Sequence, residues 1–425
     1  MTPPSWKMMS ACSSPSCSIS SVRLPAPSVY KVKAKLGDAS AEELVVLNKD
    51  QRVDLSGALA IPSPAPLTGT ARTQELHQEA AARDSDAPAL ERGDGAVIFL
   101  MVRRWTGPAP RPARIPPPDQ AELELSLRRH DGKPIFELAP DATGDLAAGQ
   151  SVAVDPGAYV LRWRAANGAL VEQSVRAVRG WQTQVFLLDD APVDTSAPRH
   201  RISMLMSRQA FDATDIELRR TEEARASLAA ERKVASREIN EQLFAKFENP
   251  MLGLFGAHLM LVARGSVAAQ SEGRGDRTRR TTPPVDFNQS LFDGAVANLR
   301  ELLGPEHPDV VALWTETSEA LAASPPPIDA PPLLWRSWNL LIGATNRWPE
   351  LVPVDVWKPV RLILPVRPFL AWSPQLDERE VDKDLASEVK RVTRTERDDD
   401  VARLLTRQLL APRAAVDELI GGASP

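Results

Sequence analysis

The sequence predicts an α+β protein, with an N-terminal antiparallel β-sandwich half followed by a mainly α-helical C-terminal half. Apolar residues alternate on both sides of the turn Asp155-Pro156-Gly157, as expected of antiparallel strands. Further turn signals recur about every ten residues between residues 96 and 188, a spacing typical of small all-β sandwiches. Beyond residue 200 the strand patterns give way to longer segments with helical periodicity.

The bulk composition indicates a globular chain with more than one domain. At 425 residues the chain exceeds the size of one hydrophobic core, so we expect two or three domains. The formal net charge of −5 does not favour a general polyanion binder, so nucleic acid is not an expected partner. The sequence contains no run of about 18 apolar residues, so we expect no membrane span. The 38 prolines and many alanines and arginines suggest a GC-rich bacterial genome.

Residues 1–27 are rich in Ser and Pro, and we predict that they form a disordered tail. Both cysteines, Cys12 and Cys17, lie in this tail, so they cannot supply a disulfide framework for the body of the protein. The tail also lacks the continuous apolar run of a signal peptide. Together these observations predict a cytoplasmic protein.

Residues 28–92 form a β-rich N-terminal segment in this interpretation. Val29–Leu36 alternates apolar and basic residues, which predicts a half-buried strand with a lysine-protected edge. Leu44–Leu47 and Arg52–Leu55 are shorter candidate strands, and Thr73–Arg83 has a polar helical pattern. The sequence leaves open whether residues 28–67 are a separate domain or add strands to the sandwich.

Residues 93–190 are the predicted β-sandwich. The continuous apolar run Ala96–Val102 predicts a strand covered on both faces, and the proline-rich Pro108–Asp119 predicts a loop. The Pro156-Gly157 turn predicts a hairpin, with Tyr159 and Trp163 on one face of its second strand because they are four residues apart.

Residues 121–188 resemble the carboxypeptidase-regulatory or PEGA-like β-sandwiches. The resemblance depends on the run Asp155–Arg162 and on the late strand through Gln184–Leu187. It covers only a small part of the chain, and we do not identify the whole chain with a family. Because such modules carry no chemistry of their own, the resemblance implies a role in recognition or spacing.

Residues 200–375 are predicted to form an α-helical domain. Asp215–Lys233 mixes Glu and Arg at helical spacing, which favours a solvated charged helix. Asn249-Pro250 is typical of a helix start, and Met251–Val262 is apolar nearly all round, as in a buried core helix. Trp357–Trp372 is interrupted by prolines and reads as an extended segment able to add a strand to the β half. Residues 376–425 are predicted to be charged C-terminal helices.

Two histidines in the helical region are the candidate functional residues, His258 and His307. His258 is the only ionisable side chain of its apolar helix, so a buried core histidine is the simpler interpretation. We expect it to lie beyond hydrogen-bonding distance of any Ser or Asp poised as a catalytic triad. A carboxylate beside an exposed His258 would instead favour an enzyme.

Residues 265–284 are polar and rich in Arg, Gly and Thr, and we predict that they form a flexible loop. Exposed flexible loops are preferred sites of proteolysis. The loop therefore contains a candidate protease-sensitive site, at Arg274, Arg277, Arg279 and Arg280.

Residues 296–321 resemble one tetratricopeptide-like helix-turn-helix, of the kinesin-light-chain sort. The similarity is carried by Leu303-Gly304-Pro305-Glu306-His307-Pro308-Asp309-Val310, which reads as a helix stop, a proline-shaped turn, an Asp cap and a new helix. A solenoid needs about three such repeats and only one is convincing here, so the resemblance implies helix-hairpin stacking alone.

The sequence contains no local motif for catalysis, cofactor binding or metal binding. It lacks a phosphate-binding Gly-Lys-Ser/Thr loop, a Gly-x-Ser-x-Gly elbow, a His-Glu-x-x-His pair and a Cys-x-x-Cys pair. Asp398-Asp399-Asp400 reads as a solvated patch rather than a metal site. We therefore predict no catalytic, cofactor or metal residues.

These observations favour a non-enzymatic bacterial interaction or adaptor protein that binds another protein. The resemblances suggest a signalling or defence operon and, by analogy, a caspase-like or trypsin-like protease as the partner. Two alternatives stay open. One is a hydrolase with a site between the β and α halves, and the other is a structural component of an assembly that uses the edge strand Val29–Leu36.

Overall fold

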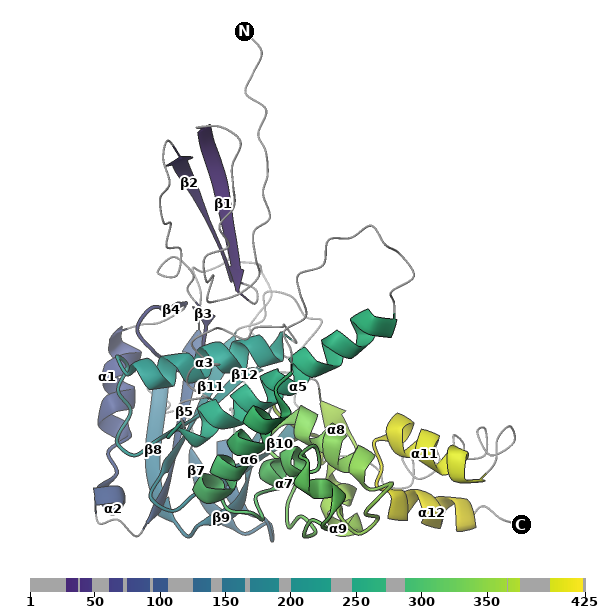
Figure 1. Ribbon diagram of the computed structural model, residues 1–425. Coiled ribbons are helices and arrows are strands. Elements are labelled where there is room, and N and C mark those ends of the chain that lie inside the picture. Colours follow the sequence, from purple (N-terminus) through teal and green to yellow (C-terminus); the bar gives the residue numbers. More distant parts are fainter. Residues whose placement is uncertain are drawn as a thin grey trace, which may run out of the picture.

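The computed structural model contains both β-sheets and α-helices, so the α+β class predicted from the sequence is confirmed (Figure 1). The structure describes residues 28–36, 39–47, 61–71, 75–91, 95–105, 125–138, 147–164, 169–190, 200–230, 247–272, 287–364, 366–374 and 398–422. The predicted tail with Cys12 and Cys17, strand Arg52–Leu55 and loop Pro108–Asp119 lie outside these described residues.

The strands are short and belong to four sheets. Their bounds are β1 Ser28–Leu36, β2 Ala39–Leu47, β3 Ile61–Pro62, β4 Thr70–Ala71, β5 Ala96–Trp105, β6 Leu125–Arg129, β7 Pro134–Leu138, β8 Ala147–Val154, β9 Gly157–Arg164, β10 Leu170–Ala177, β11 Gln182–Asp190, β12 His200–Ser207, β13 Ile363–Leu364 and β14 Ala371–Trp372.

Two helices lie between β4 and β5, and the other described helices follow β12. Their bounds are α1 Glu75–Asp84, α2 Pro88–Glu91, α3 Ile216–Ala229, α5 Pro250–Glu272, α6 Gln289–Leu303, α7 Pro308–Trp314, α8 Trp335–Ala344, α9 Val354–Trp357, α11 Asp398–Leu409 and α12 Arg413–Gly422, with 3-10 turns η2 Glu319–Leu321 and η3 Lys358–Val360.

A four-stranded sheet has the order β12-β11-β5-β8. Its central strand β5 pairs in parallel with β11 and antiparallel with β8, so the expected mainly antiparallel arrangement has one parallel exception. Successive residues of β5 face opposite sides: Ile98 and Leu100 contribute to one hydrophobic cluster, and Phe99 contributes to another beneath α1. Both faces are therefore covered, as the continuous apolar run Ala96–Val102 predicts.

A six-stranded sheet has the order β13-β14-β10-β9-β6-β7. Tyr159, Leu161 and Trp163 lie on one buried face of β9, which confirms the predicted placement of Tyr159 and Trp163 on one strand. These residues share one hydrophobic cluster with the inner face of the four-stranded sheet. Apolar side chains of both sheets therefore belong to one hydrophobic cluster, which also includes residues of the helices.

The Pro156-Gly157 turn connects the two sheets and does not close the predicted hairpin. β8, before the turn, pairs with β5, whereas β9, after it, pairs with β6 and β10. Tyr159 holds this corner, since its hydroxyl donates a hydrogen bond of 2.7 Å to the backbone oxygen of Asp155. A side chain thus fixes the turn geometry where strand pairing is absent.

The segment after residue 200 contains strands that pair with the two larger sheets. The change from strands to helices therefore does not occur at residue 200 as predicted. His200–Ser207 is β12, which pairs with β11. β14, from the predicted extended segment Trp357–Trp372, pairs with β10, which confirms that this segment adds a strand. The same segment also contains the 3-10 turn η3 and is therefore not extended throughout.

The outer face of β10 joins the sheet to the helical part through alternate polar side chains. Glu172 accepts a 2.9 Å hydrogen bond from the indole of Trp372, and it also pairs with Arg162. Ser174 donates a 2.8 Å hydrogen bond to the backbone of the proline-rich segment Pro325–Pro332. Arg176 forms an ion pair with Asp329 of the same segment. These contacts fix the helices to the sheet.

Helix α3 is more deeply packed than its charged sequence suggests. Glu222 is fully buried and Arg225 nearly so, and their side chains form an ion pair with a nitrogen–oxygen distance of 2.9 Å. The hydroxyl of Ser203 on β12 also donates to Glu222. The predicted solvated helix is therefore wrong, because α3 lies along β12 (Figure 1) and its buried charges have partners.

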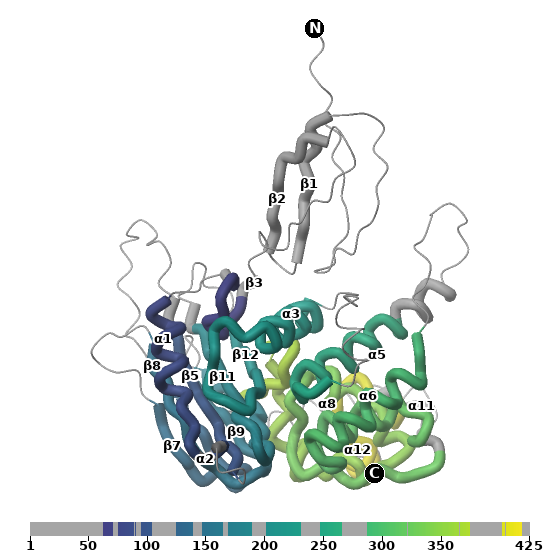
Figure 2. The backbone as a smooth tube through the Cα atoms, turned by 60° about the vertical axis from the view of Figure 1, so that its left-hand side comes forward, coloured from purple at the N-terminus to yellow at the C-terminus, as the bar shows by residue number. Residues whose placement is uncertain are grey.

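Helices α5, α6, α8, α11 and α12 gather on the opposite side of the molecule from α1 and the four-stranded sheet (Figure 2).

Asn249 begins α5 as predicted, since its side-chain oxygen accepts hydrogen bonds from the backbone of Met251 and Leu252. α5 continues to Glu272, so the predicted loop 265–284 is wrong for its first residues. A helix, once begun, extends readily through a sequence such as Val267-Ala268-Ala269-Gln270.

Candidate functional site

Both candidate histidines lie where α5, α7 and α8 meet. His258 on α5 is completely buried, which confirms that part of its prediction, and His307 immediately before α7 is 1% exposed. They occupy distant positions in the sequence, but Asp309 lies close to both through the contacts described next. The fold therefore assembles a buried polar cluster that no local motif indicates.

His258 has a serine partner, which the sequence did not indicate, so the expected absence of a triad depends on how the neighbouring hydrogen bonds are arranged. Its Nε2 lies 2.9 Å from Oγ of Ser337 on α8, and Ser337 in turn hydrogen-bonds to the carboxylate of Asp309. Sequence periodicity could not reveal this contact, because the two residues are 79 positions apart and lie on different helices. The order in space is His258, Ser337, Asp309.

The direction of the hydrogen bonds does not suit a catalytic triad. A serine hydroxyl has one proton, and here Ser337 donates it to Asp309. With Asp309 ionised, this arrangement assigns the proton of the His258–Ser337 hydrogen bond to Nε2 of His258, which then donates to Ser337 and does not accept from it. In a Ser-His-Asp triad the histidine lies between the other two and accepts the serine proton.

Asp309 is a fully buried acceptor that holds the chain before α8. Its two carboxylate oxygens accept hydrogen bonds of 2.7 Å from the backbone of Leu333 and 3.0 Å from that of Leu334. Burial raises the pKa of Asp309 to about 6, and the hydrogen bonds from Ser337 and the two backbone groups oppose this rise. The carboxylate therefore ties α7 to α8.

His307 is the cap at the start of α7, a role that the sequence analysis gave to Asp309. Its Nδ1 accepts a 3.3 Å hydrogen bond from the backbone of Asp309, so that nitrogen carries no proton. Burial lowers the pKa of His307 to about 3, and the nearby positive charge of Arg176 lowers it further. Burial likewise lowers the pKa of His258 to about 3, with Arg336 as the second cause. Both rings are neutral at physiological pH.

The polar cluster is closed to substrate. Ser337, Asp309 and His258 each have no exposed surface. Within the described part of the chain, no group of three or more His, Cys, Asp or Glu side chains is arranged to hold a metal ion. The cluster thus connects three helices by hydrogen bonds, in the way that buried polar groups usually do.

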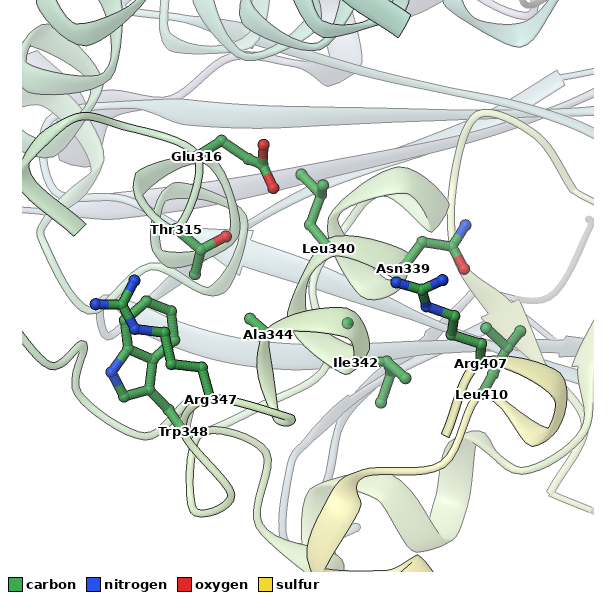
Figure 3. Close-up of a pocket in the computed structure, with 11 residues that line it drawn as sticks. Thr315, Glu316, Asn339, Leu340, Ile342, Ala344, Arg347, Trp348, Arg407 and Leu410 are labelled. Carbon is green, nitrogen blue, oxygen red and sulfur yellow. The ribbon is translucent and has the colours of Figure 1, made fainter. Parts of the chain in front are cut away.

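A separate pocket of about 540 Å³ lies where the ends of α7, α8 and α11 meet (Figure 3). Its lining residues are Thr315, Glu316, Asn339, Leu340, Ile342, Gly343, Ala344, Arg347, Trp348, Arg407 and Leu410. The volume falls within the range of pockets that accommodate small ligands or a few peptide side chains. None of these residues belongs to the His258–Ser337–Asp309 cluster.

The pocket has an aliphatic middle between two polar sides (Figure 3). Arg347 and Trp348 lie on one side of this view, and the guanidinium carbon of Arg347 is 4.5 Å from the centre of the Trp348 ring. Asn339 and Arg407 lie on the other side, with Leu340 and Ala344 between the two sides. Such a surface offers apolar contact together with hydrogen-bond donors.

No local motif in the sequence indicates this pocket. Arg274, Arg277, Arg279 and Arg280 fall outside the described residues. The Arg347-Trp348 pair, just after α8, is a local feature of the sequence, but only the folded chain brings Arg407 to it. Asp398-Asp399-Asp400 forms the start of α11.

Comparison of the chain with known protein families, curated proteins and solved structures finds no match among any of them.

Proposed function

We propose that this chain is a non-enzymatic protein–protein interaction protein, an adaptor whose partner is another protein. The observation that carries the proposal is the complete burial of His258, Ser337 and Asp309, the residues with the strongest resemblance to catalytic groups. Their hydrogen bonds support helix packing, and the proton of Ser337 points to Asp309 rather than to a base. The accessible pocket contains no His and no Cys.

The two packed sheets are, in this proposal, a recognition sandwich of the carboxypeptidase-regulatory or PEGA-like kind. The shared hydrophobic cluster around Leu161 and Trp163 supports it, because it leaves the connecting loops for contact with a partner. The helix pair α6 and α7 would provide a second, tetratricopeptide-like surface. A bacterial, cytoplasmic setting with a caspase-like or trypsin-like protease as partner completes the proposal by analogy.

The part of the chain that the structure describes includes no helix with the length and apolar character needed to cross a lipid bilayer.

The proposal is tested by producing the full chain together with the products of its neighbouring genes and measuring the mass of the purified species by light scattering. We expect a complex of fixed stoichiometry, which a Ser337→Ala variant with an unchanged circular dichroism spectrum also forms. Hydrolysis of an ester or peptide substrate by the chain alone, lost in Ser337→Ala, would instead support the hydrolase alternative.

A further inference from the structure

The pocket between α7, α8 and α11 contains one arginine, Arg407, that no described residue neutralises. Arg407 is exposed, and within the described parts of the chain its guanidinium has no hydrogen-bond or ion-pair partner. Asn339, on the same side of the pocket in Figure 3, likewise has an amide without a partner among the described residues. With respect to the described residues, both groups are available to a ligand.

The acidic residue of the pocket does not cancel this charge. The carboxylate of Glu316 forms an ion pair with Arg264 of α5, outside the set of lining residues. Among the described residues the charge of Arg407 is therefore left unpaired in the pocket, which favours a ligand with a carboxylate or another anion. Arg is well suited to a carboxylate, because its planar guanidinium donates two parallel hydrogen bonds.

The aromatic side chain of the pocket, Trp348, already packs against other side chains of the protein. Arg347 covers Trp348 at 4.5 Å from the ring centre, and the ring of Trp314 lies 6.3 Å away on a tilted plane. A nucleotide base would need a free aromatic face on which to stack. The remaining walls are aliphatic, provided by Leu340, Ala344 and Leu410, which suit an aliphatic side chain better than a base.

Leu410 has a backbone conformation that a side chain rarely adopts. Its φ is +49°, in the left-handed region, and it is the only non-glycine residue with positive φ in the described ranges. This conformation costs of the order of 1 kcal/mol and often occurs at binding sites. It places Leu410 in the pocket lining between α11 and α12.

We propose that this pocket binds a segment of another protein that presents an aliphatic side chain next to a carboxylate. Arg407 holds the carboxylate, the amide of Asn339 pairs with the peptide backbone, and Leu340 and Leu410 enclose the aliphatic group. This inference rests on the proposed function, since it names the chemistry of the partner that the adaptor recognises.

The test measures fluorescence anisotropy of the folded full chain with three pools of fluorescein-labelled hexapeptides. One pool alternates Asp or Glu with Leu, Ile or Val, the second replaces the acids with Asn or Gln, and the third replaces them with Lys. We expect saturable binding of the acidic pool and at least about tenfold weaker binding of the other two, the value of one charge-assisted contact. Equal binding of the acidic and amide pools would overturn the proposal, as would binding of a fluorescent nucleotide without the acidic peptides.

Two variants assign the binding to the pocket. Arg407→Ala should weaken the acidic pool about tenfold, whereas Arg129→Ala, which removes an exposed arginine of β6 paired with Asp155, should leave it unchanged. Leu410→Gly should also weaken binding while raising the urea midpoint, because glycine relieves the positive φ. Equal effects of Arg407→Ala and Arg129→Ala, or an unchanged affinity in Leu410→Gly, would contradict the assignment.

The outcome also separates this inference from the proposed function. If the complex with the partner protein forms with the same affinity in Arg407→Ala, the pocket inference fails and the adaptor proposal stands. If the chain forms no complex and binds none of the peptides, both fail.

Discussion

The ring of Phe247 packs against α5 at Gly253, where no other residue leaves enough space for it. We therefore predict that replacing this glycine destabilises the protein. A Cβ added to Gly253 would lie 2.5 Å or less from three ring atoms of Phe247, far inside normal contact distance. Phe247 is 6% exposed, and its backbone oxygen accepts a 2.8 Å hydrogen bond from Asn298 of α6. The ring therefore has little space into which to move when Gly253 is replaced by Ala.

The magnitude follows from two opposing effects. Overpacking a well-filled core destabilises by about 1–3 kcal/mol, whereas replacing glycine with alanine inside a helix stabilises by about 1 kcal/mol. We expect Gly253→Ala to lower the free energy of unfolding by up to about 2 kcal/mol. Gly294→Ala in α6 is the matched control, because a Cβ there meets nothing within 4 Å, and it should gain about 0.5–1 kcal/mol.

Urea unfolding of the full-length variants, followed by tryptophan fluorescence, measures these changes. Phe247→Leu in the Gly253→Ala background should recover part of the loss, and a double-mutant cycle then isolates the clash. If Gly253→Ala proved as stable as Gly294→Ala, the packing of Phe247 on α5 described here would be incorrect.

Three further predictions test other contacts. Folding lowers the pKa values of His258 and His307 from 6.5 to about 3. As the pH falls, both histidines therefore take up protons in the unfolded chain before they do so in the folded protein. The folded state consequently loses stability progressively between pH 6.5 and pH 3. The raised pKa of Asp309, about 6, acts in the opposite direction between about pH 6 and 4, so calorimetry at pH 5 should find a net uptake of at least about one proton on unfolding, and a net release would contradict the assignment. Glu172→Ala should destabilise by about 2–3 kcal/mol in urea, since it leaves the buried indole of Trp372 and the largely buried Arg162 without their acceptor, whereas the exposed Glu137→Ala should change stability by less than about 0.5 kcal/mol; equal effects would refute the role of Glu172. Limited trypsin digestion should cut first at Arg274, Arg277, Arg279 or Arg280 and leave two stable fragments, and first cuts within residues 96–188 would count against this prediction.

Local signals predicted the individual strands and helices well. The alternation in Gly157–Arg164 placed Tyr159 and Trp163 on one face, and the Asn249-Pro250 pair marked the start of α5. These features depend on neighbours a few residues away, so the sequence contains the whole of the information needed.

Pairing between distant strands was not predictable in the same way. The Asp155-Pro156-Gly157 turn looks like a hairpin, yet the strands before and after it belong to different sheets. The choice is made by β5, which pairs with both β8 and β11 and is separated from each by a long stretch of chain. Alternation specifies which face of a strand is buried but not which strand lies beside it.

The sequence did not predict the polar contacts that are buried in the fold, including those of the candidate site. Glu222 and Arg225 look solvated in sequence because nothing local reveals Ser203 and β12 above them. The same holds for Ser337, whose partners His258 and Asp309 come from two other helices. The sequence predicted the burial of His258 from its apolar neighbours, but only the fold supplies its hydrogen-bond partner.

The central claim is that the buried His258–Ser337–Asp309 cluster supports the fold and performs no chemistry. Incubation of the folded full chain with a fluorophosphonate, which modifies activated serines, followed by intact mass spectrometry, tests this claim most directly. The account predicts an unmodified mass, because Ser337 is fully buried and donates its proton to Asp309. A single adduct on Ser337 that disappears in His258→Ala would contradict it and establish the chain as a hydrolase.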